Sequence, residues 1–416
     1  MRTPFVSLNS WLDGGTILQG ADPAEIVTGG PSDWPLLAAA LERHRDTADR
    51  PDRLHPAGAA VGYFTYEGGF WFAFYPRLVA AEKNFNNPRW RAARRAWRED
   101  HPKPDRPVSS GQWRRPASLS WRSNLTRAQY TAAVRRAQDY IRAGDIYQVN
   151  LAQRFGTGPR PTPVDPYALF QELCWRSPAP GAAFIDTGGS QILSSSPELF
   201  LQIQGRAIRT RPIKGTRPRD RDPLRDQQLA YELMTDPKEL AELIMITDLE
   251  RNDLGRICEF GSVTVPELLQ RETFAQVHHL VSTVEGTLRP GVGPVEALAA
   301  CFPGGSITGA PKKRAMEIIA ELEPGPRGVF TGAIGYFGFN GDAAFSIAIR
   351  TLVAEADGEL HAHAGSGITA GSDPDGEYEE TLHKASGMKL ALERFLHHSE
   401  GEVAPPTPHG LPEPQP

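Results

Sequence analysis

The sequence predicts an α+β fold, because strand-like and helix-like patterns both recur along it. Short apolar runs separated by turn residues, such as residues 59–66 and 71–75, are typical of β-strands. Later segments carry apolar residues at helical spacing, as Tyr130, Val134 and Ile141 do. At 416 residues the chain is long enough to bury one large core or two smaller ones.

Composition gives no reason to expect a protein that binds nucleic acids or membranes. The formal net charge is −5, and no apolar run is long enough for a signal peptide or a transmembrane helix. Three cysteines, Cys174, Cys258 and Cys301, lie far apart without a Cys-x-x-Cys pair. We interpret them as reduced thiols of a cytoplasmic protein.

The first 88 residues are expected to supply strands and one short amphipathic helix at residues 35–45. Residues 89–120 are rich in Arg, Trp and Pro and predict a basic linker that crosses the surface. A nucleic-acid-binding segment is an alternative for this linker, and the acidic charge of the whole chain disfavours it. Residues 399–416 are rich in proline and predict a disordered tail.

A helix and a strand are predicted directly after the linker. Thr126 and Gln129 have the spacing of a capping box, and Gly144 is placed to end the helix. The next block alternates as a strand, with Gln148 and Asn150 on its polar face. From these residues alone, that face is what an exposed surface would also present.

The segment at residues 209–219 is the most distinctive in the chain. Lys214 is predicted at the end of a short strand, and Gly215 leaves no side chain beside it to obstruct a ligand. A nucleophilic lysine must be neutral, and nearby cations together with burial would lower its pKa. Four arginines lie within five residues of it: Arg209, Arg211, Arg217 and Arg219. An ordinary surface lysine beside a turn would fit the same spacing.

The pentapeptide Pro-Ile-Lys-Gly-Thr at residues 212–216 resembles a signature of aminodeoxychorismate synthase component I. That enzyme belongs to the chorismate-utilising family, with anthranilate synthase component I and the isochorismate and salicylate synthases. At least six blocks between Ser123 and Leu396 resemble the family in the same order. The resemblance implies that the α+β fold is a large two-sheet β-sandwich flanked by helices, and that residues 121–398 form a chorismate-binding catalytic domain.

The resemblance also assigns chemistry to three residues. Anthranilate synthases carry a small residue where Lys214 stands, so Lys214 favours a covalent lysine mechanism. Glu198 corresponds to the acid that protonates the departing ring hydroxyl, a role that requires a carboxyl group kept protonated by burial. Taken alone, Glu198 is equally an ordinary turn residue. The isochorismate and salicylate synthases have a lysine at the position of Gln148, so Gln148 argues against a hydroxylating reaction.

Two Glu-x-x-Glu pairs predict a Mg²⁺ site, because carboxylate oxygens are the ligands that this ion prefers. Glu239 and Glu242 lie in a helix that begins at Asp236, and Glu239 also occupies a capping-box position. Glu377 and Glu380 lie in the last helix. Exposed pairs of this spacing are common, and the resemblance favours the metal role, with Glu242 and Glu380 as main ligands and Glu239 and Glu377 in support.

The remaining predicted residues would bind the substrate. A glycine-rich loop at residues 301–314 runs into a helix, and its hydroxyls and backbone N–H groups suit a carboxylated molecule. The loop lacks a Walker pattern, so a nucleotide is not expected. Glycines near residue 365 would let a ligand approach a strand closely. With the residues that the resemblance adds, the predicted set is Arg350, Lys384, Gly365, Ser366, Gly367, His279, Ser306, Thr308, Gln148 and Thr216.

The resemblance implies that the chain aminates chorismate at ring carbon 4. The product would be 4-amino-4-deoxychorismate, a precursor of 4-aminobenzoate in folate biosynthesis. The sequence contains no Cys-His-Glu glutaminase domain, so we expect a separate glutaminase subunit to deliver the ammonia. Two alternatives stay open: anthranilate synthase component I, and a non-catalytic subunit that activates a glutaminase.

Overall fold

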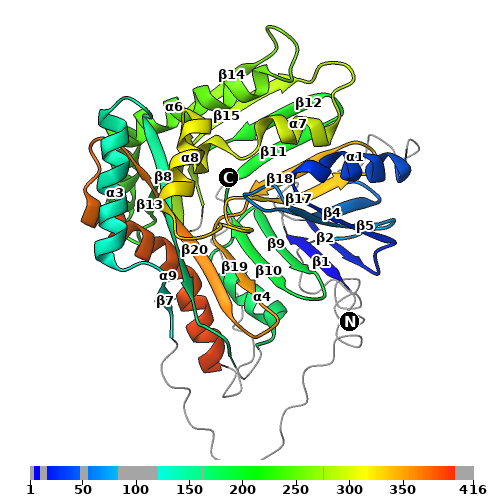
Figure 1. Ribbon diagram of the computed structural model, residues 1–416, viewed down its shortest axis with the longest axis horizontal. Coiled ribbons are helices and arrows are strands. Elements are labelled where there is room, and N and C mark those ends of the chain that lie inside the picture. Colours follow the sequence, from blue (N-terminus) through cyan, green and yellow to red (C-terminus); the bar gives the residue numbers. More distant parts are fainter. Residues whose placement is uncertain are drawn as a thin grey trace, which may run out of the picture.

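Two large antiparallel sheets and the helices around them form the molecule (Figure 1). The computed structural model describes residues 4–9, 16–46, 55–82, 120–160, 164–274 and 276–398. Each sheet has ten strands within these ranges. This arrangement confirms the predicted α+β fold with two sheets flanked by helices.

The first sheet holds strands from both ends of the described chain. In spatial order it contains β16 (Gly309–Ala310), β8 (Gln148–Gly156), β20 (Leu360–Ile368), β19 (Thr351–Ala354), β10 (Gln191–Ser196), β9 (Gly181–Asp186), β1 (Phe5–Asn9), β2 (Thr16–Ala21) and β6 (Val79–Glu82), while β7 (Arg122–Ser123) pairs with β8.

The second sheet also combines early strands of the chain with later ones. Its order is β13 (Ile213–Pro218), β15 (Val277–Thr287), β12 (Ala207–Arg211), β11 (Leu199–Gln204), β18 (Ala343–Ile347), β17 (Ala333–Gly338), β4 (Ala59–Phe64), β5 (Phe70–Tyr75) and β3 (Glu25–Gly29), while β14 (Thr264–Thr273) pairs with β15. The strands that precede residue 83 are therefore divided between the two sheets.

Local sequence explains where several helices begin. An Asp-Pro step opens α4 (Pro166–Arg176), α5 (Pro223–Thr235) and α6 (Pro237–Gly255), with the aspartate side chain accepting a backbone N–H of the first turn. The predicted capping box of Thr126 and Gln129 is confirmed at the start of α3 (Arg127–Arg142). The other helices are α1 (Trp34–Arg43), α7 (Pro294–Cys301), α8 (Lys312–Leu322) and α9 (Pro374–His398), with short 3₁₀ turns η1 (Pro31–Asp33) and η2 (Gly305–Ile307).

Apolar side chains fill the space between the sheets and beneath the helices. Val6 and Ile185 of the first sheet belong to the same buried cluster as Val61 and Ile334 of the second. Helices α4 and α9 cover the other face of the first sheet, where their side chains pack with β9 and β10. Burial of these faces supplies most of the driving force for folding.

Two predicted strand boundaries were wrong. Lys214 lies inside β13, and a β-bulge falls between it and Thr216, so Lys214 does not end a strand. The sequence predicts residues 345–353 as one strand of a β-hairpin with residues 330–339, but the structure divides this run into β18 of the second sheet and β19 of the first. Arg350 lies in the connection with a φ of +50°, and this left-handed backbone breaks the strand.

Some predictions fall on residues that the structure does not describe. They are almost all of the linker, residues 89–119, and the whole tail, residues 399–416. The proposed domain boundaries therefore stay predictions. None of the helices within the described ranges combines the length and the hydropathy that crossing a bilayer requires.

Candidate active site

The side chain of Lys214 extends from β13 and is largely enclosed by α6 and the glycine-rich loop. Its Nζ donates to the backbone oxygen of Ser306 at 3.4 Å and lies 3.8 Å from Glu242 Oε2. Only 14% of the Lys214 side chain is exposed. Gly215 has a φ of +72°, and a Cβ there would come within 2.7 Å of Leu233. Glycine at this position therefore permits the bulge and the close packing of β13 on its neighbours.

The four arginines around Lys214 in sequence have partners of their own. Arg209 donates to Gln202 at 2.7 Å, and Arg211 pairs with Glu272. The other two, Arg217 and Arg219, bind Asp236 and Asp226 at 2.9 and 2.8 Å. The ion pair that Lys214 makes is with a carboxylate, so the structure does not support the expectation that these arginines create a cationic environment for the lysine.

Glu198 is buried where the chain passes from β10 in the first sheet to β11 in the second. Burial raises the pKa of its carboxyl group, while the Ser306 hydroxyl and the Lys214 ammonium act in the opposite direction. A raised pKa is what a general acid needs at neutral pH. The geometry is therefore compatible with the predicted role of Glu198.

Arg350 lies in the reverse passage, from β18 in the second sheet to β19 in the first. Within the described part of the chain its guanidinium makes no hydrogen bond or ion pair, and burial lowers its pKa against the influence of Glu198. His279 Nδ1 lies 2.9 Å from Thr216 Oγ1. Burial lowers the pKa of His279 to about 4, with the Arg350 charge adding to this effect, so the imidazole is neutral at neutral pH. An unpaired, half-buried guanidinium suits a carboxylate ligand.

Three buried polar atoms on β8 and in the glycine-rich loop lack hydrogen-bond partners in the described structure. They are Gln148 Nε2, Asn150 Oδ1 and Ser306 Oγ, the last of which lies near the Glu198 carboxyl group without forming a hydrogen bond to it. A Cβ on Gly367 would lie 2.8 Å from Gln148 Nε2, and a Cβ on Gly365 would lie 2.5 Å from Asn150 Oδ1. Buried polar atoms are usually hydrogen-bonded, so this group indicates a place for a polar ligand.

Other predicted substrate residues have partners within the protein. Thr308 Oγ1 donates to the backbone oxygen of Gly304 at 2.9 Å. The Ser366 hydroxyl binds Glu377 Oε2. Lys384 Nζ donates to the backbone oxygen of Gly365 at 3.0 Å and pairs with Glu380 at 2.7 Å. These side chains support the walls of the site.

The four predicted metal ligands come from two helices that contribute to the same region. Glu239 and Glu242 lie on α6, and Glu377 and Glu380 lie on α9. The Glu239 carboxylate pairs with Arg217 at 3.5 Å, while the Asp236 side chain caps the helix. Burial, followed by the Glu242 charge, raises the pKa of Glu239. Burial acts to raise the pKa of Glu380, but the charges of Lys384 and the other nearby lysines outweigh this effect and lower the pKa.

The donor atoms of this set are carboxylate oxygens, which fit Mg²⁺ by their chemistry. Across the described residues, however, no three Asp, Glu, His or Cys side chains converge closely enough to hold a metal ion. Lys238 Nζ instead lies near two of the carboxylates, 3.9 Å from Glu242 Oε1 and 3.5 Å from Glu377 Oε1. A metal ion would therefore require these side chains to rearrange.

Sequence reasoning missed several residues of this region. Asn150 was placed on a polar strand face, which was the available signal, but it was not included in the site. Glu250 is fully buried and accepts a hydrogen bond from Thr210 Oγ1 at 2.7 Å. Arg327 joins two walls of the site by donating to the backbone oxygens of Asn150 at 2.8 Å and Ile307 at 3.0 Å. Only the tertiary fold reveals these last two contacts.

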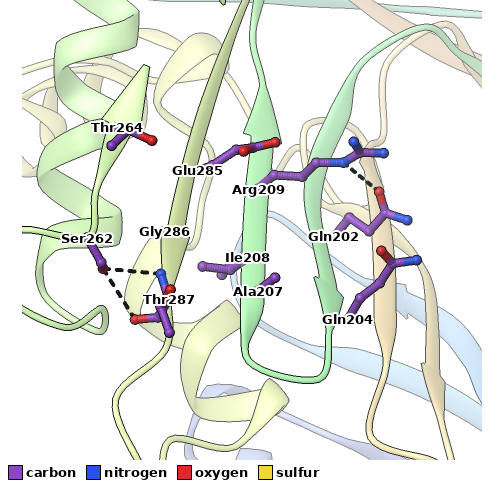
Figure 2. Close-up of a pocket in the computed structure, with 10 residues that line it drawn as sticks. All are labelled: Gln202, Gln204, Ala207, Ile208, Arg209, Ser262, Thr264, Glu285, Gly286 and Thr287. Carbon is purple, nitrogen blue, oxygen red and sulfur yellow. Dashed lines mark hydrogen bonds between the residues drawn. The ribbon is translucent and has the colours of Figure 1, made fainter. Parts of the chain in front are cut away.

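A separate pocket of about 310 Å³ lies on the second sheet, across β11, β12, β14 and β15 (Figure 2). Its lining includes Gln202, Arg209 and Glu285. None of the predicted site residues lines this pocket. The pocket is thus distinct from the group of residues around Lys214.

A family model described as chorismate binding enzyme matches residues 9–390. The chain belongs to this family. A solved structure of anthranilate synthase component I from Streptococcus pneumoniae is similar to the chain, with a TM-score of 0.69 and 28% identity over 92% of this chain and 89% of that one. A putative 2,3-dihydroxybenzoate-specific isochorismate synthase from Bacillus anthracis shares the fold, with a TM-score of 0.72 and 21% identity over 94% of this chain and 96% of that one.

Curated relatives in the family divide between two enzymes. Anthranilate synthase component 1 of Streptomyces coelicolor is 46% identical over 290 residues, which are 70% of this chain and 56% of the relative. The enzyme of the same name from Thermus thermophilus is 45% identical over 85% of this chain and 80% of the relative. Aminodeoxychorismate synthase component 1 of Klebsiella aerogenes is 48% identical over 66% of this chain and 60% of the relative. The chain thus spans a little over half the length of the Streptomyces relative.

Proposed function

We propose that this chain aminates chorismate at ring carbon 4 and forms 4-amino-4-deoxychorismate. The observation that carries the proposal is the placement of Lys214, whose side chain is largely buried in the region that also holds Glu198. The pentapeptide around Lys214 resembles the signature of aminodeoxychorismate synthase, whereas anthranilate synthases carry a small residue there. Membership of the chorismate-binding family supports the choice of substrate.

Binding would use polar groups that have no hydrogen-bond partner among the described residues. The Arg350 guanidinium would pair with a carboxylate of chorismate, and the amide of Gln148 and the hydroxyl of Ser306 would bind its polar atoms. Mg²⁺, held by Glu242 and Glu380 with Glu239 and Glu377 in support, would polarise the ring carboxylate when bound. Lys238 would have to leave Glu242 and Glu377 before that.

The chemical steps assigned to this chain's residues are two substitutions. The Lys214 amine, once it has given up its proton, forms a bond to ring carbon 2, both ring double bonds shift, and the bond from carbon 4 to its hydroxyl breaks. Glu198 gives that hydroxyl a proton, so water leaves. Ammonia then bonds to carbon 4, both double bonds shift back, and the bond from carbon 2 to Lys214 breaks. The proton that the new ammonium group loses returns to Glu198. The enolpyruvyl group is retained throughout.

The variant Lys214→Ala tests the proposal. We expect it to fold and bind chorismate but to lose most formation of 4-amino-4-deoxychorismate, because the covalent route needs the amine. Products from chorismate, ammonium and Mg²⁺ are identified by liquid chromatography and mass spectrometry. Without ammonia, the wild-type protein should form an adduct on the peptide that contains Lys214. The exposed Lys313→Ala is the matched control.

Production of 4-amino-4-deoxychorismate by Lys214→Ala at the wild-type rate, with no adduct on the wild-type protein, would contradict this mechanism. Anthranilate synthase is the second candidate, favoured by the relatives of that name from Streptomyces and Thermus. Its products would be anthranilate and pyruvate, so the same assay distinguishes the two reactions.

A further inference from the structure

Lys238 contacts carboxylates on two different helices. Its Nζ lies 3.9 Å from Glu242 Oε1 on α6 and 3.5 Å from Glu377 Oε1 on α9. The Lys238 side chain is 52% exposed, whereas those of Glu242 and Glu377 are 12% and 4% exposed. A solvent-accessible ammonium therefore reaches inward to two enclosed carboxylates.

Each of the four glutamates pairs with a cation of the chain. Glu239 pairs with Arg217, Glu242 with Lys214 and Lys238, Glu377 with Lys238, and Glu380 with Lys384. Among the ion pairs of the described residues, only the Lys238 ammonium contacts a glutamate from both helices. Lys238 thus joins α6 to α9 electrostatically through two of the proposed metal ligands.

The position of Lys238 within α6 strengthens this interpretation. Lys238 is the second residue of α6, where the helix dipole favours negative side chains and disfavours cations. The helix itself therefore gives no reason for a lysine there. The carboxylates of Glu242 and Glu377 do, because without a nearby cation their negative charges would repel each other.

We propose that Lys238 is an internal counter-ion that holds Glu242 and Glu377 together and competes with Mg²⁺ for them. This inference rests on the metal site of the proposed function. The ammonium already contacts the carboxylates of Glu242 and Glu377, which a metal ion bound at this site would also need. Because the Lys238 stem is flexible and half-exposed, its ammonium can turn out to water when the divalent ion enters.

The variant Lys238→Met tests this, since methionine keeps an unbranched side chain without the charge. Binding of Mg²⁺ alone is measured by calorimetry, and binding of Mn²⁺ by electron paramagnetic resonance. We expect the Kd for Mg²⁺ to fall by about fivefold or more, because a competing ion pair is removed. With EDTA, Lys238→Met should unfold at a lower temperature than the wild type, and Mg²⁺ should restore much of the loss.

The control is Lys389→Met on α9, which removes a lysine paired with Glu393 at 3.6 Å and should leave metal binding unchanged. A folded Lys238→Met protein with the same or a weaker Mg²⁺ affinity would overturn the inference. The variant Glu242→Gln tests the proposed metal site separately from the role of Lys238, because it removes a proposed ligand and should abolish Mg²⁺ binding. If the wild-type protein binds neither ion, the metal site of the proposed function fails and the role of Lys238 fails with it.

Discussion

At the scale of single residues, burial sets the charge of the acidic groups behind the site. Glu198 and Glu250 are both buried, and burial raises the pKa of each, that of Glu250 to about 8. Glu250 is therefore protonated in the folded protein at neutral pH. An uncharged Glu250 adds no negative charge to the buried region that also holds Glu198.

Glu250 should make the stability of the protein depend on pH. Between its ordinary value of 4.5 and about 8, the unfolded chain releases the Glu250 proton while the folded chain keeps it. The stability that Glu250 contributes is thus present in full below pH 4.5 and lost as the pH rises through 8. Relative to Glu250→Gln, the wild type should lose up to about 1.4 kcal/mol of unfolding free energy per pH unit in this window.

Urea unfolding of both proteins from pH 5 to pH 8 measures this difference. Glutamine keeps the shape of the protonated side chain and can still accept the hydrogen bond from Thr210. If the difference in unfolding free energy did not change with pH, Glu250 would not be protonated in the folded state.

Arg350 is expected to serve binding and not stability. Its guanidinium has no ion-pair partner in the described residues, so Arg350→Lys should change the melting temperature little. Lysine cannot bind a carboxylate through two parallel hydrogen bonds, so affinity for chorismate should fall by about tenfold to a hundredfold. Fluorescence titration with chorismate and thermal melting measure the two effects. A large loss of stability with unchanged affinity would assign Arg350 to the fold instead.

At the scale of elements, two connections between the sheets place the acid and the arginine. The passage from β10 to β11 carries Glu198, and the passage from β18 to β19 carries Arg350. The N–H of Ile347 donates to Glu198 O, and the N–H of Ser195 donates to Arg350 O, both at 3.1 Å. The two connections therefore fix each other, and the two predicted site residues gain a rigid support.

The helices α6 and α9 carry the proposed metal ligands, and this gives a prediction. Treatment with EDTA should abolish turnover of chorismate, and added Mg²⁺ should restore it. Glu242→Gln and Glu380→Gln should each lose nearly all activity, because a neutral amide is a poor ligand for Mg²⁺. Steady-state assays with ammonium measure this, with Glu393→Gln on α9 as the control. Full activity in EDTA would show that the metal assignment is wrong.

Local patterns in the sequence predicted much of the element structure. The alternation of β8, the cap of α3 and the Asp-Pro start of α6 each depend on nearby residues, so they could be recognised in advance. The break at Arg350 could not, because the two halves of an apolar run pair with different sheets. The partners of the arginines near Lys214 could not be recognised in advance either, since Glu272 and Asp236 approach these arginines only in the folded chain.

At the scale of the whole molecule, the site needs both sheets. Gln148 and Gly367 come from the first sheet, Lys214 and His279 from the second, and α6 and α9 bring the glutamates. The family resemblance supplied the roles of these residues, which spacing alone left open. The geometry adds the unpaired atoms and the position of Lys238, neither of which is encoded in a local pattern.

The source of ammonia gives a prediction for the whole protein. Relatives from both enzymes are named component 1, which implies a second component. We expect the purified chain to use ammonium but not glutamine, and to gain glutamine-dependent activity when a glutaminase subunit is added. Product formation with each nitrogen source measures this. Turnover of glutamine by the chain alone would contradict the expectation.

The division of the early strands between the two sheets has a consequence for how the protein is made. β1 pairs with β9, which begins at Gly181, and β4 pairs with β17, which begins at Ala333. Each of these early strands must therefore wait for one of its two partners, which is synthesised much later. Meanwhile the apolar β4, paired with β5 on one side, would expose its other edge, which favours aggregation. Closing such long loops is slow, so we expect productive folding during synthesis to depend on chaperones that shield the first strands.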